Sequence, residues 1–342
     1  MTFNVTKSDV CSSYQKEDRK NKLFKQKNPL QEPLFPPDSS WTPPELLPDI
    51  SDAKEIAVDL ETWDPNLKSK GAGWCRGDGH VVGVAVAVEG WSGYLPIRHR
   101  AGGNLDENVV FNWLKKMLNT DAKKICHNAS YDIGWLKREG ITINGQLIDT
   151  MVGAPLIDEN RFSYALNALG KEYLKEKKDE ALLRDAAEAW GVDAKADLYQ
   201  LPPMYVGPYA EQDAELTLKL WNWQKSELTR QDLWSIFNLE TSILPLLIEM
   251  RWRGVRVDLD KAEETSKKFL STELKELQKI KKIVNQEVDI WANASIATAF
   301  DKINLKYPYT EKGSPSFQQR WLEQHEHELP QAIVQARKMN KA

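Results

Sequence analysis

Short runs of apolar residues in the first half of the chain predict strands. Residues 55–60 form a β-prone run, and residues 81–88 are an almost unbroken apolar stretch that is typical of a buried central strand. Residues 93–97 and 124–127 predict two further strands, and Asn104 is placed to cap a helix between them. The apolar positions of that helix recur at helical spacing: Val109, Trp113, Leu114 and Met117. The order β-β-β-α-β-α predicts an α/β (α+β) fold in which a mixed sheet is flanked by helices.

The second half of the chain has a helical pattern. Residues 149–253 are predicted to be almost entirely helical, with breaks at Gly170, Gly191 and residues 201–203. Residues 261–290 predict an amphipathic helix that projects from the first domain. Its apolar stripe consists of Leu270, Leu274, Leu277 and Val284.

Composition narrows the class of protein. The 342 residues include 46 Lys and Arg against 50 Asp and Glu, a net charge of −4, which excludes a strongly basic protein that coats nucleic acid. Three widely spaced cysteines fit neither a disulfide framework nor a zinc site, so we expect a reducing compartment. No membrane span or signal peptide is recognisable in the sequence, and we expect a protein of the cytoplasm.

The N-terminal residues differ from the rest in charge and in proline content. Residues 1–27 carry a local charge of +4, and seven prolines between positions 29 and 48 disfavour helix and favour an extended conformation. We interpret residues 1–50 as a basic and proline-rich arm. It is either a solvated tail or a segment that contacts DNA or a partner.

Three short motifs contain the candidate chemistry. Asp59 and Glu61 are two residues apart on a predicted strand, so both side chains leave the same face of the sheet. Asp132 falls in the first turn of a helix after Asn128, a residue able to cap it. Tyr209 and Asp213 share a helix face, with Pro208 suited to the first helical position. Each motif alone is common in structures without a functional site.

Taken together, the motifs resemble the three exonuclease motifs of the DnaQ-like family. Asp-x-Glu on a strand is followed about 70 residues later by Asn-x-x-Tyr-Asp and about 80 residues further on by Tyr-x-x-x-Asp. A Tyr four residues before the last Asp resembles the DEDDy subgroup. The resemblance implies a ribonuclease H-like exonuclease fold, which we expect over residues 51–237.

Residues 238–342 are expected to form a helical thumb-like segment. Residues 238–258 resemble the junction between exonuclease and thumb in family A DNA polymerases, and residues 313–317 and 336–341 resemble thumb segments of bacteriophage members. Residues 296–299 depart from the polar, proline-containing pattern of that family.

The resemblance also implies a mechanism. Four carboxylates without Cys or His favour two Mg²⁺ or Mn²⁺ ions over Zn²⁺, and two ions roughly 4 Å apart can clamp an attacking water and a leaving 3′ oxygen. Asp59 would bridge both ions, Glu61 and Asp213 would complete the first, and Asp132 would support the second. Tyr209 would orient or help deprotonate the water bound to the first ion. The products would be nucleoside 5′-monophosphates released from a 3′ end. The candidate substrate-binding residues are Leu60, Thr62 and Asn128, with Trp63, Phe162 and Tyr164 as further groove candidates that suit a core equally well.

These features favour a 3′-5′ exonuclease that acts on single-stranded DNA or a frayed primer 3′ end and proofreads during DNA replication. The alternatives are a ribonuclease D-like exoribonuclease and a non-catalytic DNA-binding scaffold of a replication assembly. The sequence shows no palm or fingers, so we expect a separate polymerase chain as partner. We also expect apolar surface to be exposed on the helix from Lys261 and on residues 321–334 unless a partner covers it.

Overall fold

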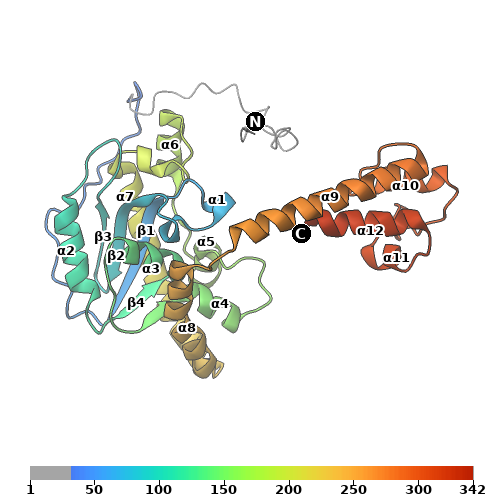
Figure 1. Cartoon of the computed structure of the whole chain (residues 1–342). Helices are drawn as coiled ribbons and strands as arrows, with labels where there is room; N and C mark the ends of the chain where they lie inside the picture. The colour runs from blue at the N-terminus through green and yellow to red at the C-terminus, as the bar shows by residue number, and fades with distance from the viewer. Residues whose placement is uncertain (1–31, 342) are drawn as a thin grey trace. The chain divides into compact units, whose positions relative to one another are not determined.

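The computed structural model describes residues 32–341 (Figure 1). Internal contacts divide the chain into two compact units, one ending at Gly254 and the other beginning at Val255. Among the described residues, no helix combines the length and the apolar character that crossing a membrane requires. Residues 1–31 lie outside the described part, so the predicted basic segment 1–27 is not addressed by the structure.

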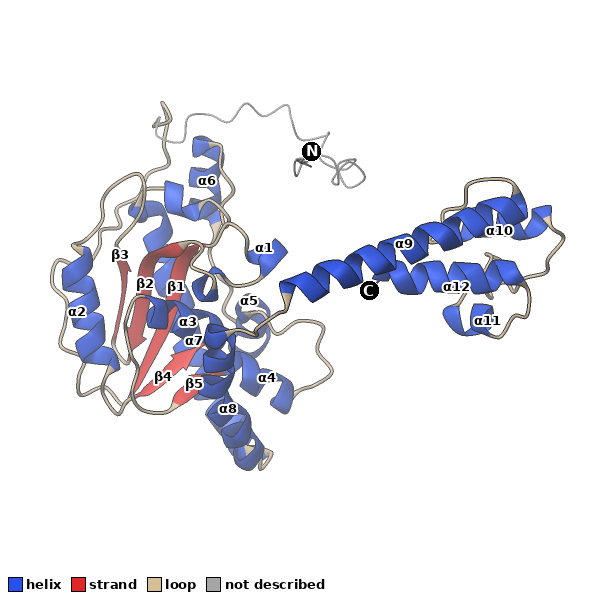
Figure 2. Ribbon diagram, in the orientation of Figure 1, coloured by secondary structure: helices blue, strands red, loops and turns tan. Residues whose placement is uncertain are grey.

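The first unit is built on a mixed sheet of five strands in the order β3-β2-β1-β4-β5 (Figure 2). The strands are β1 (Glu55–Trp63), β2 (His80–Val88), β3 (Trp91–Pro96), β4 (Lys123–Cys126) and β5 (Leu147–Asp149). The central strand β1 pairs antiparallel with β2 and parallel with β4. The predicted mixed sheet is therefore confirmed.

Helices cover both faces of this sheet. The helices of the first unit are α1 (Leu67–Lys70), α2 (Glu107–Leu118), α3 (Ala129–Arg138), α4 (Thr150–Ile157), α5 (Leu166–Leu169), α6 (Ala181–Trp190), α7 (Pro203–Arg230) and α8 (Trp234–Arg253). Ile56, Val58 and Leu60 of β1 share one core with residues of α2, α3 and α8. Ala57 shares the other core with α6 and α7. Because side chains alternate along a strand, Asp59 and Glu61 leave β1 on the α7 face.

Three details of the first unit differ from the sequence prediction. The three-residue strand β5 was not predicted, and its last residue, Asp149, fell in the range expected to be helical; pairing with β4 makes the segment a strand. Asp106, not Asn104, caps α2, because the Asn104 carboxamide is bonded to the backbone of His99. Val109, predicted to face the core, is 56% exposed.

The prediction that Pro208 begins its helix was wrong. Pro203 takes the first position of α7, which leaves Pro208 inside the helix. A proline there cannot donate to the carbonyl four residues earlier, that of Met204. The Ser39 hydroxyl donates to this carbonyl at 2.8 Å instead.

The described part of the proline-rich arm packs on the first unit. Besides Ser39, Trp41 lies against Gly207 of α7, so closely that a Cβ at Gly207 would come within 2.2 Å of the indole. The Pro37 carbonyl accepts a hydrogen bond from Tyr205, and that of Pro48 accepts one from Trp113. Residues 37–48 are therefore anchored to the domain and are not a solvated tail.

The second unit is helical and has a core of its own. Its helices are α9 (Leu259–Val284), α10 (Asn293–Lys302), α11 (Gln319–Glu323) and α12 (Glu328–Lys341). The predicted amphipathic helix is present as α9, and its Leu270 is 55% exposed. The expectation of exposed apolar surface on residues 321–334 was wrong, because Leu322, Leu329 and Ile333 are fully buried in this second core.

Candidate active site

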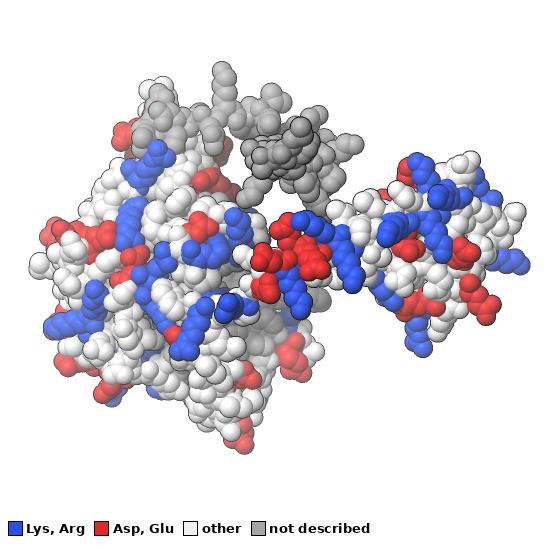
Figure 3. Space-filling view, in the orientation of Figure 1, with Lys and Arg blue, Asp and Glu red and all other residues white. Residues whose placement is uncertain are grey.

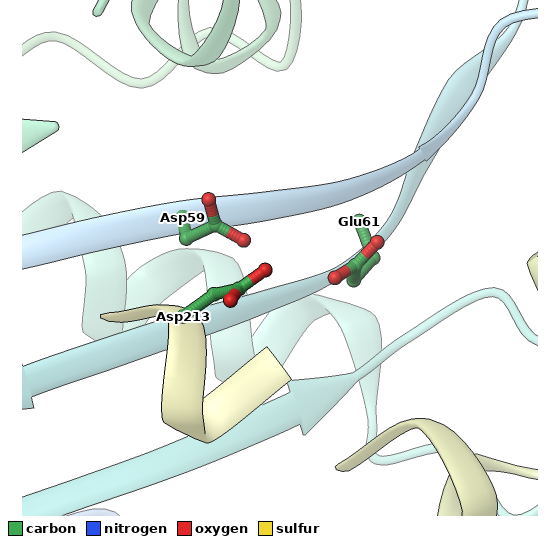
Figure 4. Close-up of side chains that lie close together, drawn as sticks. All are labelled: Asp59, Glu61 and Asp213. Carbon is green, nitrogen blue, oxygen red and sulfur yellow. The ribbon is translucent and has the colours of Figure 1, made fainter. Parts of the chain in front are cut away.

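Three carboxylates from two elements meet on the α7 face of the sheet. Asp59 and Glu61 come from β1 and Asp213 from α7, and each offers an oxygen that lies within 4.8 Å of the others (Figure 4). Asp213 is buried, whereas Asp59 and Glu61 are partly exposed. The first and third sequence motifs, about 150 residues apart, are thus brought together by the packing of α7 on β1.

Burial is the main cause that raises the pKa of every carboxyl in the cluster. Burial, with the charge of Asp213, raises the pKa of Asp59 from 3.8 to about 7. Burial, with the charges of Asp59 and Asp213, holds the pKa of Glu61 well above its usual value. Burial likewise raises the pKa of Asp213, although Lys178 opposes the effect. The protein alone therefore opposes full ionisation of these acids, and a cation would relieve the repulsion.

Asp132 is buried in the first turn of α3, outside the three-carboxylate cluster. Burial is the main cause that raises its pKa, followed by the charges of Asp59 and Asp149. Its helix begins after Asn128, which has φ 76° and forms no capping hydrogen bond with its side chain, so the predicted Asn cap is absent. Asp149 caps the start of α3 instead, because its carboxylate accepts hydrogen bonds from the backbone N–H groups of Asn128 and Ala129.

Tyr209 and Asp213 lie one turn apart on α7, as predicted, and share a cationic neighbour. The Nζ of Lys178 is 2.5 Å from a carboxylate oxygen of Asp213 and 3.3 Å from the Tyr209 hydroxyl. Burial and the nearby acids hold the pKa of Tyr209 above its ordinary range. The phenol therefore keeps its proton at neutral pH and can donate a hydrogen bond, but it is a poor base.

The predicted substrate-binding residues occupy three different environments. Leu60 is 6% exposed and belongs to the core shared with α2 and α3. The Thr62 hydroxyl shares a hydrogen bond of 2.7 Å with the Tyr131 hydroxyl beside the end of β1. Asn128 is exposed at the start of α3. Their contact with substrate remains a prediction.

The further groove candidates are also separated. Trp63 packs on Tyr199 with ring centroids 5.3 Å apart, and the Tyr164 hydroxyl donates to the carbonyl of Asp158. Phe162 is fully exposed.

Two residues of this region were not singled out from the sequence. Lys178 follows Lys175, Glu176 and Lys177, and such a charged run is typical of a solvated loop. Asp149 had a recognisable signal in the sequence, because it follows the apolar pair Leu147-Ile148 and Asp is favoured at helix N-caps. The structure shows it capping α4.

The residues of the cluster fit a hard divalent cation. All the donors are carboxylate oxygens, which Mg²⁺ and Mn²⁺ prefer. Both carboxylate oxygens of Asp213 lie 2.5 Å from the Nζ of Lys178. The lysine ammonium beside Asp213 shows that this position favours positive charge.

Comparisons with known proteins show the family of this chain. A sequence model of the 3′-5′ exonuclease domain of family A DNA polymerases matches residues 37–229. This chain belongs to that family. The resemblance drawn from the three motifs is therefore confirmed.

Relatives of this exonuclease-family chain include phage polymerases. It is 37% identical over 325 residues to a DNA-directed DNA polymerase of Pseudomonas phage M6, which covers 91% of this chain and 49% of the relative. It is 30% identical over 312 residues to the DNA polymerase DpoZ of Acinetobacter phage SH-Ab 15497, covering 86% of this chain and 48% of the relative. The chain thus spans about half the length of these curated relatives.

A solved structure shares the fold of this family member over most of its length. The POL domain of Pol1 from M. smegmatis, in complex with DNA primer-template and dNTP, matches 85% of the chain and 45% of its own length, with a TM-score of 0.61 at 17% identity. The likeness concerns the fold alone. It agrees with the mixed sheet, the flanking helices and the helical segment predicted from the sequence.

Proposed function

We propose that this chain is a divalent-metal-dependent 3′-5′ exodeoxyribonuclease that proofreads DNA 3′ ends in a replication assembly. The observation that carries the proposal is the carboxylate cluster of Asp59, Glu61 and Asp213, with oxygens within 4.8 Å of one another in a chain of the exonuclease family. Its setting would be the cytoplasm of a bacterial or phage-infected cell.

The residues take the following roles in this proposal. Asp59, Glu61 and Asp213 would hold one Mg²⁺ or Mn²⁺ ion, and Asp132 with Asp59 would hold a second. Bound divalent ions supply Lewis-acid activation of water and of the phosphodiester. The Tyr209 hydroxyl, kept protonated by its surroundings, orients the attacking water by a hydrogen bond.

The surface charge of the protein agrees with recognition at a local site. Acidic side chains are interspersed with basic ones on the face of the first unit seen in Figure 3. A site that binds one phosphate through metal ions does not need a strongly basic protein surface, so the net charge of −4 is compatible with a nucleic-acid substrate.

Hydrolysis of labelled oligonucleotides tests the proposal. With 5′-labelled single-stranded DNA and Mg²⁺, the wild-type protein should shorten the strand from its 3′ end, and EDTA should stop the reaction. Asp213→Asn should be inactive, whereas Asp185→Asn, which changes an exposed carboxylate of α6, should retain wild-type activity. Failure of the folded wild-type protein to hydrolyse DNA would contradict the proposal, and a strong preference for RNA would favour the ribonuclease D-like alternative.

We also propose that the partner is a polypeptide that carries a polymerase palm and fingers. The relatives are named as DNA polymerases and are about twice as long as this chain. Helix α8 exposes Leu239, Leu246 and Met250 by 59 to 60% each, an apolar surface suited to a protein contact. The isolated chain should therefore not extend a primer, and incorporation of nucleotides by it would contradict this part of the proposal.

A further inference from the structure

A lysine is buried against the carboxylate cluster. The side chain of Lys178 is 7% exposed and that of Asp213 is 6% exposed, so their ion pair is largely shielded from water. Lys178 belongs to the loop between α5 and α6, where its neighbours Lys175 and Lys177 are exposed. The loop thus directs one of its lysines into the site.

The position of the ammonium is set by several contacts. Besides Asp213, it contacts the Tyr209 hydroxyl at 3.3 Å and lies 4.5 Å from the centre of the Tyr209 ring. The backbone N–H of Lys178 donates to the Asn167 side chain. A second lysine, Lys195, lies 5.8 Å from the same ring but is mostly exposed and pairs with Glu180. Of these two lysines, Lys178 is the one whose ammonium contacts an acid of the cluster, Asp213.

The ion pair has a consequence for metal binding. Asp213 is one of three carboxylates that would hold a divalent ion, and its oxygens already face an ammonium. A divalent ion bound by Asp213 would lie close to the ammonium of Lys178 and would be repelled by it, since the interaction of like charges grows as their separation falls. A buried carboxylate without any counter-ion is also unfavourable. Lys178 therefore stabilises the buried carboxylate of Asp213 in the metal-free protein and opposes metal binding there.

We propose that Lys178 is the built-in counter-ion of the metal-free site and competes with the divalent ion for Asp213. This inference rests on the proposed function. Metal binding displaces the ammonium from Asp213, and the loop at residues 175–180 is the segment that accommodates the displacement. Lys178 thereby sets the metal affinity of the site while it stabilises the acids when no metal is bound.

Calorimetric titration with Mn²⁺ at pH 8 tests the inference on four proteins: wild type, Lys178→Met, Lys178→Arg and Lys177→Met. Lys178→Met should bind Mn²⁺ at least about tenfold more tightly, because the competing charge is gone. Lys178→Arg, which keeps the charge, should stay near wild type. Lys177→Met removes the same charge from the exposed neighbour and should also stay near wild type.

Thermal unfolding gives a second readout that does not depend on catalysis. In EDTA, Lys178→Met should unfold at a lower temperature than wild type, and added Mn²⁺ should raise its unfolding temperature by a larger increment, since the stabilisation grows with affinity. This increment can be measured even in a destabilised variant. An Mn²⁺ affinity of Lys178→Met equal to or weaker than that of wild type would overturn the inference.

The two proposals fail in different ways. A wild-type protein that degrades DNA with Mn²⁺, together with a Lys178→Met variant that gains no affinity, would overturn the role of Lys178 alone. A folded wild-type protein that neither hydrolyses DNA nor binds Mn²⁺, together with a Lys178→Met variant that binds none, would overturn the proposed function and the inference with it.

Discussion

Asp59→Asn should stabilise the metal-free protein above neutral pH while abolishing its nuclease activity. In the folded state the pKa of Asp59 is raised from 3.8 to about 7, chiefly by burial and then by the charge of Asp213. A shift of about 3 units, at about 1.4 kcal/mol each, corresponds to about 4 kcal/mol. This is the free energy by which ionisation of Asp59 destabilises the fold when no divalent ion is bound.

The sign of the effect follows from the protons bound in each state. Below about pH 4 the Asp59 carboxyl is protonated both folded and unfolded, so it has no effect on the free energy of unfolding. Between about pH 4 and 7 only the folded state keeps the proton, and stability therefore falls as pH rises through this window. An Asn at this position carries no charge at any of these pH values, so its variant lacks this loss.

Thermal unfolding followed by circular dichroism in EDTA, from pH 4 to pH 8, measures the difference. At pH 4 the two proteins should unfold at similar temperatures, and at pH 8 the Asn variant should unfold roughly 10 °C higher, from about 2 to 4 °C per kcal/mol for a domain of this size. Asp185→Asn, at an exposed position, should show no such pH-dependent gain. Equal or lower stability of Asp59→Asn at pH 8 would refute the reasoning that repulsion and burial at Asp59 oppose folding.

Three further outcomes are expected. Asp132→Ala should reduce hydrolysis of single-stranded DNA by at least about 10²-fold with the fold retained, as circular dichroism would show, because it removes a proposed ligand; activity near wild type would exclude that role. Tyr209→Phe should lower the rate by less than about 10²-fold, the lower end of general acid-base effects, and a loss as complete as that of Asp132→Ala would assign the phenol a different role. Ser39→Ala should lower the free energy of unfolding by about 1 kcal/mol in urea titration, because the carbonyl of Met204 then has no hydrogen-bond donor, since Pro208 has no N–H to offer it. An unchanged midpoint would mean that water replaces the hydroxyl.

The local pattern of the sequence was sufficient to predict most of the sheet and the candidate chemistry. The apolar runs predicted four of the five strands of the described chain, because a buried strand needs side chains that pack on both of its faces. The separation of Asp59 and Glu61 by two residues put both on one face, and the i, i+4 spacing put Tyr209 above Asp213. These relations depend only on backbone periodicity, which residue order expresses directly.

Other features were decided by contacts between segments that are distant in the sequence. The strand β5 has three residues, too few to show the alternation of apolar and polar positions that predicts a strand. It forms because its backbone pairs with the edge of β4. The anchoring of residues 37–48 uses contacts with distant residues, among them the hydrogen bond from Ser39 to the carbonyl of Met204, 165 positions away. Leu329 and Ile333 are buried because α12 packs on α9, whereas their weak local pattern suggested exposure.

The same division applies to the candidate site. The sequence by itself determined which residues carry carboxylates and on which faces of their own elements they lie. Only the tertiary structure brought Asp213 to Asp59 and Glu61, raised the pKa values of these acids, and placed Lys178 among them. Burial and charge-charge interaction depend on distances through space, and for residues 35 to 154 positions apart the fold decides those distances.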